Sequence, residues 1–447
     1  MSDKLKKPYQ IVTSVYVALI LSFFLLFFDK HGLAAISAAK ARCYATLTLC
    51  YFAAILVLFS VHGIRRKLHW AELRSDLKNT PAAAWLILLY LLFTVVSALL
   101  SSYGTVWLGG MRREGVLTIA LYCVSFLLVS RFYRASRRHL YLFAAATTAF
   151  CGICILQMLN VNVFKLYPFF GEKSSCGDFI GAFIGTIGNI DFAASFLCIA
   201  IPILWCGILR LKDRRRHLLL IPLLLCLVVL VRINVAAGYL GVIIGALLSL
   251  PVVLPCAKRA RIIVLLAVIA LFAASLTVIY FIKFPQTELR QLHNLLHGKI
   301  KDAYASGRIY IWRRTLRAAP EHFWFGTGPD SMSLAAFARQ EVTDANGGVL
   351  YVKVFDAAHN EYLTILFHQG VFALLSYLSA LVVTLVQWVR RARENAVAAI
   401  TGTAVVCYCL QAFFGISQLI TSPFFWCAFA ILVNALSDKS EARKIDF

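Results

Sequence analysis

The chain has 447 residues, of which 61% are hydrophobic and only 15% are charged. Soluble domains average about half apolar and about a quarter charged residues, so much of this chain must face lipid rather than water. The net charge of +23 does not indicate a nucleic-acid-binding protein, because the 44 Lys and Arg residues lie in short clusters between apolar runs, where they act as topology signals and contact anionic lipid.

Apolar runs of about 18 residues or more recur along the chain, and each is long enough to cross a bilayer as a helix. They do not alternate between polar and apolar residues as the strands of a membrane β-barrel do. The sequence therefore predicts an all-α, polytopic membrane protein of about 12 transmembrane helices with a long, partly helical extracytoplasmic loop. The expected spans are 9–28, 43–61, 82–100, 116–130, 141–160, 190–209, 218–234, 235–254, 262–282, 362–388, 396–416 and 423–437.

The basic residues orient these spans. With the N-terminus in the cytoplasm, the inner segments hold 26 Lys and Arg and the short outer segments hold eight, as the positive-inside rule requires. The other ten lie in residues 283–357, a segment that is outer but too long to obey the rule. We expect residues 1–282 to form a first membrane bundle of about nine spans, 283–361 an extracytoplasmic loop, and 362–447 the last three spans and a cytoplasmic tail. Both termini are then cytoplasmic.

Neither the cysteines nor the short inner loops indicate a cofactor site. Most of the 13 cysteines lie inside apolar runs, where thiols pack as small hydrophobic groups. Cys151 and Cys154 form a CxxC motif, but no second pair or nearby histidine completes a metal site. The inner loops are too short for a nucleotide-binding domain, which disfavours ATP-driven transport and the use of cytoplasmic nucleotide-sugar donors.

The long outer loop contains two stretches of helical periodicity. The first has leucines at helical spacing among polar residues, which predicts an amphipathic helix at the membrane surface: Leu289, Leu292, Leu295 and Leu296. The second, 308–319, places Ile309, Trp312 and Leu316 on one face and ends at Pro320. A turn rich in glycine and proline follows it.

Two histidines belong to the tenth span or its outer end. His359 should lie at the outer mouth of this helix, solvated enough to titrate near neutrality. Gly370 lies eleven residues on, about three turns of helix, so it should share a face with His359 and let another helix or a lipid chain approach. On spacing alone, a polar residue that caps the helix is the alternative. His368 should be a buried neutral histidine bonded to a neighbouring helix, although ionisable groups inside membranes are also functional candidates.

Arginines on the outer side form a second group of candidates. Arg308 begins the second helical stretch of the loop, and its planar guanidinium suits a diphosphate, because it can pair with two phosphate oxygens; anchoring to lipid headgroups is the alternative. Arg112 and Arg113 join the third and fourth spans, and Arg232 ends the seventh, where each alone could be a snorkelling arginine. Their location at the same membrane face as His359 predicts an anionic substrate that approaches from outside.

In combination, these residues resemble the O-antigen ligase and polymerase superfamily. The resemblance spans most of the chain and is strongest from about residue 300 to residue 375. Its features are the topology, the late outer loop, the glycines and asparagine of Gly185-Thr186-x-Gly188-Asn189, the motif Ser-Gly-Arg308-x-x-x-Trp312, the turn Gly326-x-Gly328, and His359-Asn360 followed by nine residues and Gly370.

The resemblance implies glycan transfer from a lipid diphosphate carrier, typically undecaprenyl diphosphate, on the outer face of the bacterial cytoplasmic membrane. It implies that a histidine at the position of His359 activates the acceptor hydroxyl while arginines hold the donor diphosphate, a step that needs a general base and charge neutralisation. No cofactor or metal is expected, because the donor bond is already activated. The partners would be the lipid-linked oligosaccharide donor, a glycan, lipid or protein acceptor, and membrane lipids. The expected residues are His359 and Arg308 for catalysis, and Arg232, Arg112, Arg113, Asn360, Trp312 and Gly370 for substrate binding.

The sequence departs from the family pattern at one position. Members often carry Ser-Arg before a stretch like residues 237–241, Ala-Gly-Tyr-Leu-Gly, but here Val235-Ala236 precedes it. Arg232, about one helical turn earlier, is the candidate to replace the missing arginine. The alternatives to a polymerase or ligase are a related peptidoglycan or teichoic-acid glycosyltransferase, a transporter or flippase of an anionic lipid or solute, and a non-catalytic divergent member.

Overall fold

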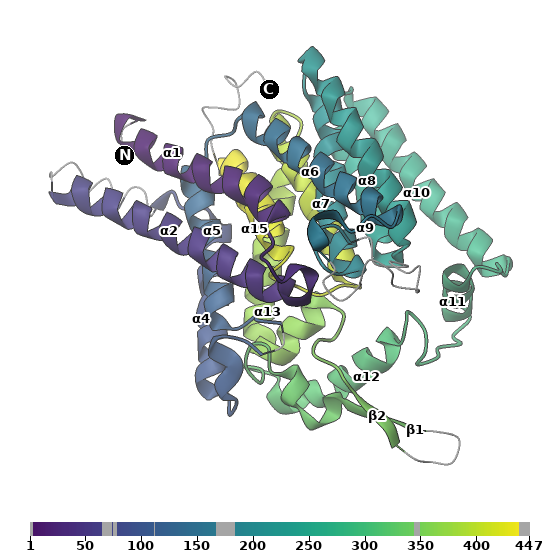
Figure 1. Cartoon of the computed structure of the whole chain (residues 1–447). Helices are drawn as coiled ribbons and strands as arrows, with labels where there is room; N and C mark the ends of the chain where they lie inside the picture. Colours follow the sequence, from purple (N-terminus) through teal and green to yellow (C-terminus); the bar gives the residue numbers. More distant parts are fainter. Residues whose placement is uncertain are drawn as a thin grey trace.

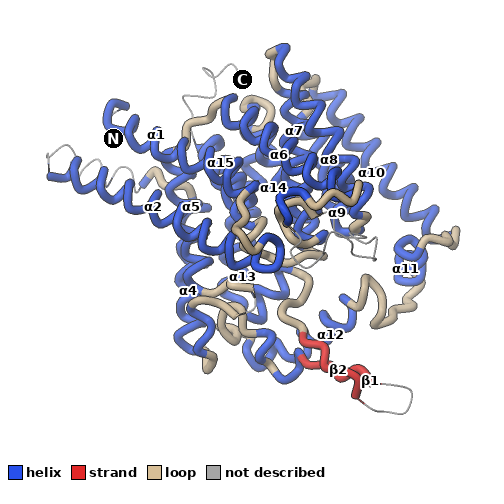
Figure 2. Tube along the Cα trace, in the orientation of Figure 1, coloured by secondary structure: helices blue, strands red, loops and turns tan. Residues whose placement is uncertain are grey.

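A computed structural model describes residues 3–64, 74, 78–110, 112–166, 184–343 and 349–437 of the chain. Helices dominate it (Figure 1), and the strands in the described ranges form one two-stranded hairpin, drawn in red in Figure 2. Within these ranges nine helices are long and apolar enough to cross a membrane, and three shorter apolar helices accompany them. Together they coincide with the expected spans, so the predicted all-α polytopic fold is confirmed. The tail expected after the last span lies outside the described residues.

The spanning helices follow the apolar runs of the sequence, and the long segment between α10 and α13 adds shorter elements. The spanning helices are α1 Asp3–Leu19 (continued by a π-helical turn, Ile20–Phe24), α2 Ile36–Ile64, α4 Ala82–Leu100, α5 Val116–Phe132, α6 Arg137–Met158, α7 Ile190–Arg210, α8 Leu220–Ile233, α9 Ala236–Val253, α10 Lys258–Phe281, α13 Glu361–Arg391, α14 Ala396–Ala412 and α15 Ser422–Ser437. The shorter elements are α11 Thr287–Leu296, α12 Arg308–Ala318, β1 Arg339–Thr343 and β2 Val349–Val354, and the two strands pair antiparallel.

The core of the bundle lies where α7, α14 and α15 meet, and most side chains of these helices are buried. Helix α14 packs on α7 and α9, α15 packs on α5, and α13 packs on α4, so the last three spans complete a bundle with the earlier ones. A Cβ on Gly245 of α9 would lie 2.5 Å from Cys407 Sγ of α14, so the glycine permits this close approach. Cys151 and Cys154 are buried in α6, as expected for packing residues. Helix α10 lies at the edge of the bundle and is mostly exposed (Figure 1).

Successive helix ends meet at one end of the bundle, which we call the loop face because the segment from α11 to β2 packs there. Ser101, after α4, donates a hydrogen bond to the carbonyl of Thr327. Ser417, between α14 and α15, donates to Glu114, just before α5. Asp191, at the start of α7, lies near Arg308. The spans therefore alternate in direction as expected; that the loop face is extracytoplasmic stays a prediction.

Helix α13 is broken at Gly370, whose backbone has φ 82° and ψ 177°. The hydroxyl of Tyr377 donates to Glu361 at 2.8 Å although 16 residues separate them. A straight helix would place these residues about 24 Å apart, so the chain bends sharply at the glycine. Residues 361–369 therefore form a short half-helix that turns back on the rest of α13, and residues 371–391, about 30 Å long, suffice to span. The expectation of one continuous span over 362–388 was wrong.

We call the described residues between α10 and α13, 282–343 and 349–360, the outer segment, after its predicted side of the membrane. This segment fills the break in α13. The amides of Thr327 and Gly328 donate to the carbonyls of Phe367 (3.0 Å) and His368 (2.8 Å), and the amide of Val371 donates to Phe323 (2.8 Å). These bonds satisfy backbone groups that the break leaves without helical partners, a requirement for irregular backbone at membrane depth. The predicted glycine turn thus forms, and its backbone hydrogen bonds attach the outer segment to α13.

Both predicted helices of the outer segment form, but α12 buries a different face from the one expected. Ile311 and Thr315 are buried, whereas Leu316 is 52% exposed. Ile311 packs into a small cluster that the outer segment builds with the half-helix, made of Ile311, Met332, Ala335, Ala338, Phe355, Ala358 and Phe367. Apolar residues occupy two neighbouring faces of α12. The face with Ile311 is the buried one, because it packs into this cluster.

Candidate functional site

His359 lies between β2 and α13 with a left-handed backbone, φ 50°, which is uncommon for a residue other than glycine. Its side chain is half-buried, and the charges near it belong to Arg308, Arg112, Asp356 and Asp191. The pKa of His359 is lowered to about 4, chiefly by burial and also by the two arginines, while the two carboxylates oppose the shift. The expectation of titration near neutrality was wrong, because His359 is desolvated and stands among cations. The imidazole is neutral at pH 7.

Arg308 enters the site from the first turn of α12. Three residues in succession before it, Ala305, Ser306 and Gly307, have positive φ, and this tight turn starts the helix. One guanidinium nitrogen donates to the carbonyl of Ala305 at 3.1 Å, and another lies 4.0 Å from Asp191 Oδ1. Its Nε is buried without a hydrogen-bond partner among the described residues. The guanidinium is therefore held in place with donor capacity to spare.

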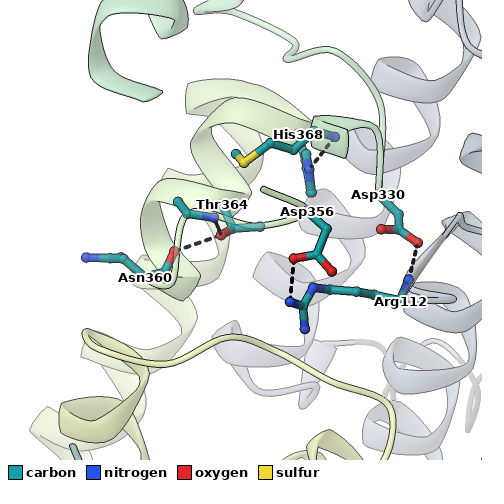
Figure 3. Close-up of polar contacts among 8 residues, drawn as sticks. Arg112, Asp330, Asp356, Asn360, Thr364 and His368 are labelled. Carbon is teal, nitrogen blue, oxygen red and sulfur yellow. Dashed lines mark hydrogen bonds and ion pairs between the residues drawn. The ribbon is translucent and has the colours of Figure 1, made fainter. Parts of the chain in front are cut away.

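Arg112 enters from the loop between α4 and α5, and two aspartates of the outer segment hold it (Figure 3). Its Nη2 donates to Asp356 Oδ1 at 2.5 Å, and its backbone amide donates to Asp330 Oδ2 at 3.2 Å. The amide of Glu114 donates to the same Asp330 oxygen at 3.4 Å. Burial raises the pKa of Asp330. The charges of two of the predicted arginines, Arg112 and Arg308, both act on His359.

Residues 221–378 match a family model described as O-antigen ligase. Over this region, which we call the O-antigen ligase region, the chain is similar to the O-antigen ligase superfamily. No curated protein matches the chain. The match confirms the resemblance and supports, in general terms, a membrane glycan ligase or polymerase. Arg308 and His359 lie inside the matched O-antigen ligase region, whereas Arg112 and Asp191 lie outside it, so the site also depends on the helices that precede that region.

Asn360 has a structural task in the O-antigen ligase region. It is 2% exposed, and its side-chain oxygen accepts the amide of Leu363 at 3.0 Å, which caps α13. The contact with substrate that was expected for Asn360 stays a prediction. Thr364 Oγ1 accepts the amide of Ala358 at 3.2 Å and donates to the carbonyl of Asn360, as Figure 3 shows, so the cap also fixes the backbone on both sides of His359.

Gly370 and His368 also differ from their expected settings. His359 precedes the helix in a left-handed conformation, so helical spacing does not place Gly370 on the same face. The chain that approaches Gly370 is the outer segment at Trp324, not another helix or a lipid, and a Cβ there would collide with the Trp324 carbonyl. His368 is buried, and its Nε2 accepts the amide of Met332 at 3.2 Å, so its partner is the outer segment rather than a neighbouring helix.

The other predicted substrate-binding residues lie around this centre. Arg113 is exposed next to Arg112 and has a left-handed backbone, φ 58°. Trp312 lies one turn along α12 from Arg308 and packs against Phe413 and Phe414, with ring centroids 5.8 Å from each, at the end of α14. Arg232 is exposed at the end of α8, at the loop face.

A small cavity that the half-helix helps to line was not anticipated from the sequence. Its volume is about 50 Å³, and Arg112, Glu114, Asp330, Glu361 and His368 are among the residues that line it. Burial raises the pKa of Glu114 to about 8, and its Oε1 accepts the Tyr122 hydroxyl at 2.7 Å.

Glu361 anchors the half-helix from within this cavity. It accepts hydroxyls from Tyr377 at 2.8 Å and Tyr408 at 2.9 Å. The half-helix that follows His359 is thereby tied to both α13 and α14. The sequence signal available for Glu361 was an acidic residue at the start of an apolar span, and it did not show which hydroxyls would meet it.

Proposed function

We propose that the protein is an integral membrane glycan polymerase or ligase that transfers an oligosaccharide from an undecaprenyl-diphosphate carrier to an acceptor hydroxyl. The observation that carries the proposal is the meeting of His359, Arg308 and Arg112 at the loop face, with two of the three inside the O-antigen ligase region. A neutral imidazole beside two guanidinium groups suits a reaction that removes a proton and releases a diphosphate.

His359 acts as the general base. The acceptor oxygen forms a bond to the anomeric carbon of the donor while the bond between that carbon and the diphosphate oxygen breaks. The acceptor proton passes to the imidazole of His359, which is neutral at pH 7 and free to accept it. The bound diphosphate adds negative charge beside Arg308 and Arg112, so it raises the pKa of His359 and strengthens the base when the donor is present.

Arg308 and Arg112 neutralise the leaving diphosphate. Each has a buried Nε without a hydrogen-bond partner among the described residues, in addition to the nitrogens already bonded to carboxylate or carbonyl. Preorganised donors of this kind stabilise charge that develops in the transition state. Arg113 and Arg232, which are exposed near the site and at the loop face, are proposed to contact the outer parts of the donor headgroup. Trp312 is proposed to line its binding surface.

The proposed setting is the bacterial cytoplasmic membrane, with both termini in the cytoplasm and residues 283–361 outside. The positive-inside distribution of Lys and Arg supports this orientation. A lipid-linked donor exposed on the outer face would then reach the loop face directly. A transporter is disfavoured, since transporters bind substrate near the bilayer midplane, whereas the candidate residues gather at the loop face.

The test is His359→Ala in a cell that makes the polymer. Loss of a positioned general base lowers the rate by about 10²–10⁴-fold, so the polymer should disappear at an unchanged protein level. The matched control is His322→Ala, which removes an exposed histidine of the same outer segment and should preserve the polymer. Polymer of normal length and yield from the His359→Ala protein would exclude the proposed function.

A further inference from the structure

A groove between α12 and the hairpin lies apart from the site described above, and we call it the hairpin groove. Its volume is about 760 Å³, within the range of about 300–1,000 Å³ that small-molecule sites occupy. It is lined by Tyr310, Arg314, Ala336, Arg339, Gln340, Val352 and Val354. Among the lining residues that the structure describes, the charged ones are Arg314 and Arg339.

Both walls of the hairpin groove lead to the candidate site. Helix α12 begins with Arg308, two residues before Tyr310, and β2 ends at Val354, five residues before His359. Val354 pairs with Arg339 at this end of the hairpin. The rings of Tyr310 and Phe355 lie 6.0 Å apart and join the two walls. A chain seated in the groove would therefore run outward from the neighbourhood of His359.

The lining offers the contacts that a charged sugar needs. The Arg314 guanidinium lies over the Tyr310 ring, 5.5 Å from its centroid, and donates to the Tyr310 hydroxyl at 2.5 Å. Arg339 is exposed at the opposite wall. Guanidinium groups bind carboxylates and phosphates through paired hydrogen bonds, while the tyrosine ring and the valines give apolar surface for sugar faces.

We propose that the hairpin groove binds the acceptor, and that this acceptor is an anionic saccharide chain. The proposal rests on the proposed function and names the substrate class for the second half of the reaction. The groove suits the acceptor rather than the donor, because the donor lipid must remain beside the spanning helices. The hairpin projects away from those helices beside α12 (Figures 1 and 2).

Binding to the purified full-length protein in lipid nanodiscs tests the proposal directly. The probes are tetragalacturonate, which is anionic, and maltotetraose, which is neutral. We expect tetragalacturonate to bind at least about tenfold more tightly, as one charge-assisted pair suffices to produce such a ratio. Arg339→Gln and the double variant Arg314→Gln with Arg339→Gln should remove this preference. Arg339 is exposed, so its single substitution tests the groove without disturbing the contact between Arg314 and Tyr310.

The matched control is Lys353→Gln. Lys353 lies on β2 between two lining valines but does not line the groove; its ammonium stands over the Phe355 ring, 5.4 Å from the centroid. It should bind tetragalacturonate within about twofold of the unmodified protein. Equal binding of the two probes, or an equal loss in Lys353→Gln and Arg339→Gln, would overturn the proposal, since the groove would then have no part in selecting the ligand.

The His359→Ala protein separates this proposal from the proposed function. It should bind tetragalacturonate as the unmodified protein does while making no polymer. If it makes polymer normally, the catalytic proposal fails while the binding result still decides the groove. In producing cells, the groove variants should make shorter polymer, because a weakly held acceptor leaves before further transfers.

Discussion

His359 stands among two arginines and two aspartates, and these neighbours decide its protonation state. The cap formed by Asn360 and the bond from Ala358 to Thr364 fix the backbone on either side of it. Arg112 is held in turn by Asp356 and Asp330. At the scale of residues, the site is thus a set of charges with little freedom to move, which is the arrangement that electrostatic catalysis requires.

The pH dependence of transfer follows from the lowered pKa of His359. In the free protein this pKa is about 4, below the ordinary value of about 6.5, so the proposed base remains deprotonated as the pH falls through 6.5. We expect kcat/KM, which reports the free enzyme, to stay level from pH 7 to about pH 5 and to fall only near pH 4. Arg308→Gln removes a charge that lowers this pKa, so its acid limb should move to higher pH. An acid limb near 6.5 in the unmodified protein would contradict this setting for His359.

Helix α13 shows how one element positions the site. Its break at Gly370 folds residues 361–369 back, and the outer segment supplies the hydrogen bonds that the break requires. Glu361 ties this half-helix to α13 and α14 through two tyrosines. The broken helix thereby carries His359 at its start and accepts the glycine turn of the outer segment along its side.

Gly370→Ala should destabilise the protein strongly. The positive φ disfavours alanine, and the new Cβ would collide with the Trp324 carbonyl, so we expect a loss of about 2–5 kcal/mol in the free energy of unfolding. Thermal unfolding in detergent measures it. Gly152→Ala in α6 is the control, because its Cβ meets nothing within 4 Å and alanine favours the helix. Equal stability of the two variants would show that the break does not need glycine.

At the scale of the whole molecule, the bundle and the outer segment depend on each other. Four parts of the bundle contact the segment between α10 and α13: the α4–α5 loop, the start of α7, the α14–α15 loop and the half-helix. The outer segment is therefore a part of the membrane fold that closes over the loop face, and the site lies where the two meet.

The orientation of the bundle can be tested with introduced cysteines. Lys353→Cys, on the exposed surface of the hairpin, should react with a membrane-impermeant maleimide in intact cells. Arg393→Cys, at the opposite end of the bundle between α13 and α14, should react only after permeabilisation. The unmodified protein gives the background from its own cysteines. Labelling of Arg393→Cys in intact cells, with Lys353→Cys protected, would reverse the proposed topology.

Sequence alone determined the spans apart from the break in α13, the two helices of the outer segment, and the residues that resemble the O-antigen ligase superfamily. These are local properties: the length of an apolar run, the period of its side chains and the spacing of a motif all lie within short stretches of chain. It also identified His359, Arg308 and Arg112, which the structure brings together. Sequence reasoning missed Asp356 and Asp330. The only signal for them was that they lie close in sequence to His359 and Gly328.

Only the tertiary structure decided how those residues act. Arg112 and Asp356 are separated by 244 positions, and no periodicity in the sequence pairs them. The break at Gly370 depends on an outer segment that supplies backbone hydrogen bonds, and the low pKa of His359 depends on burial among cations from separate elements. Long-range contacts set these features, because solvation and charge interactions depend on distance in space and not on distance along the chain.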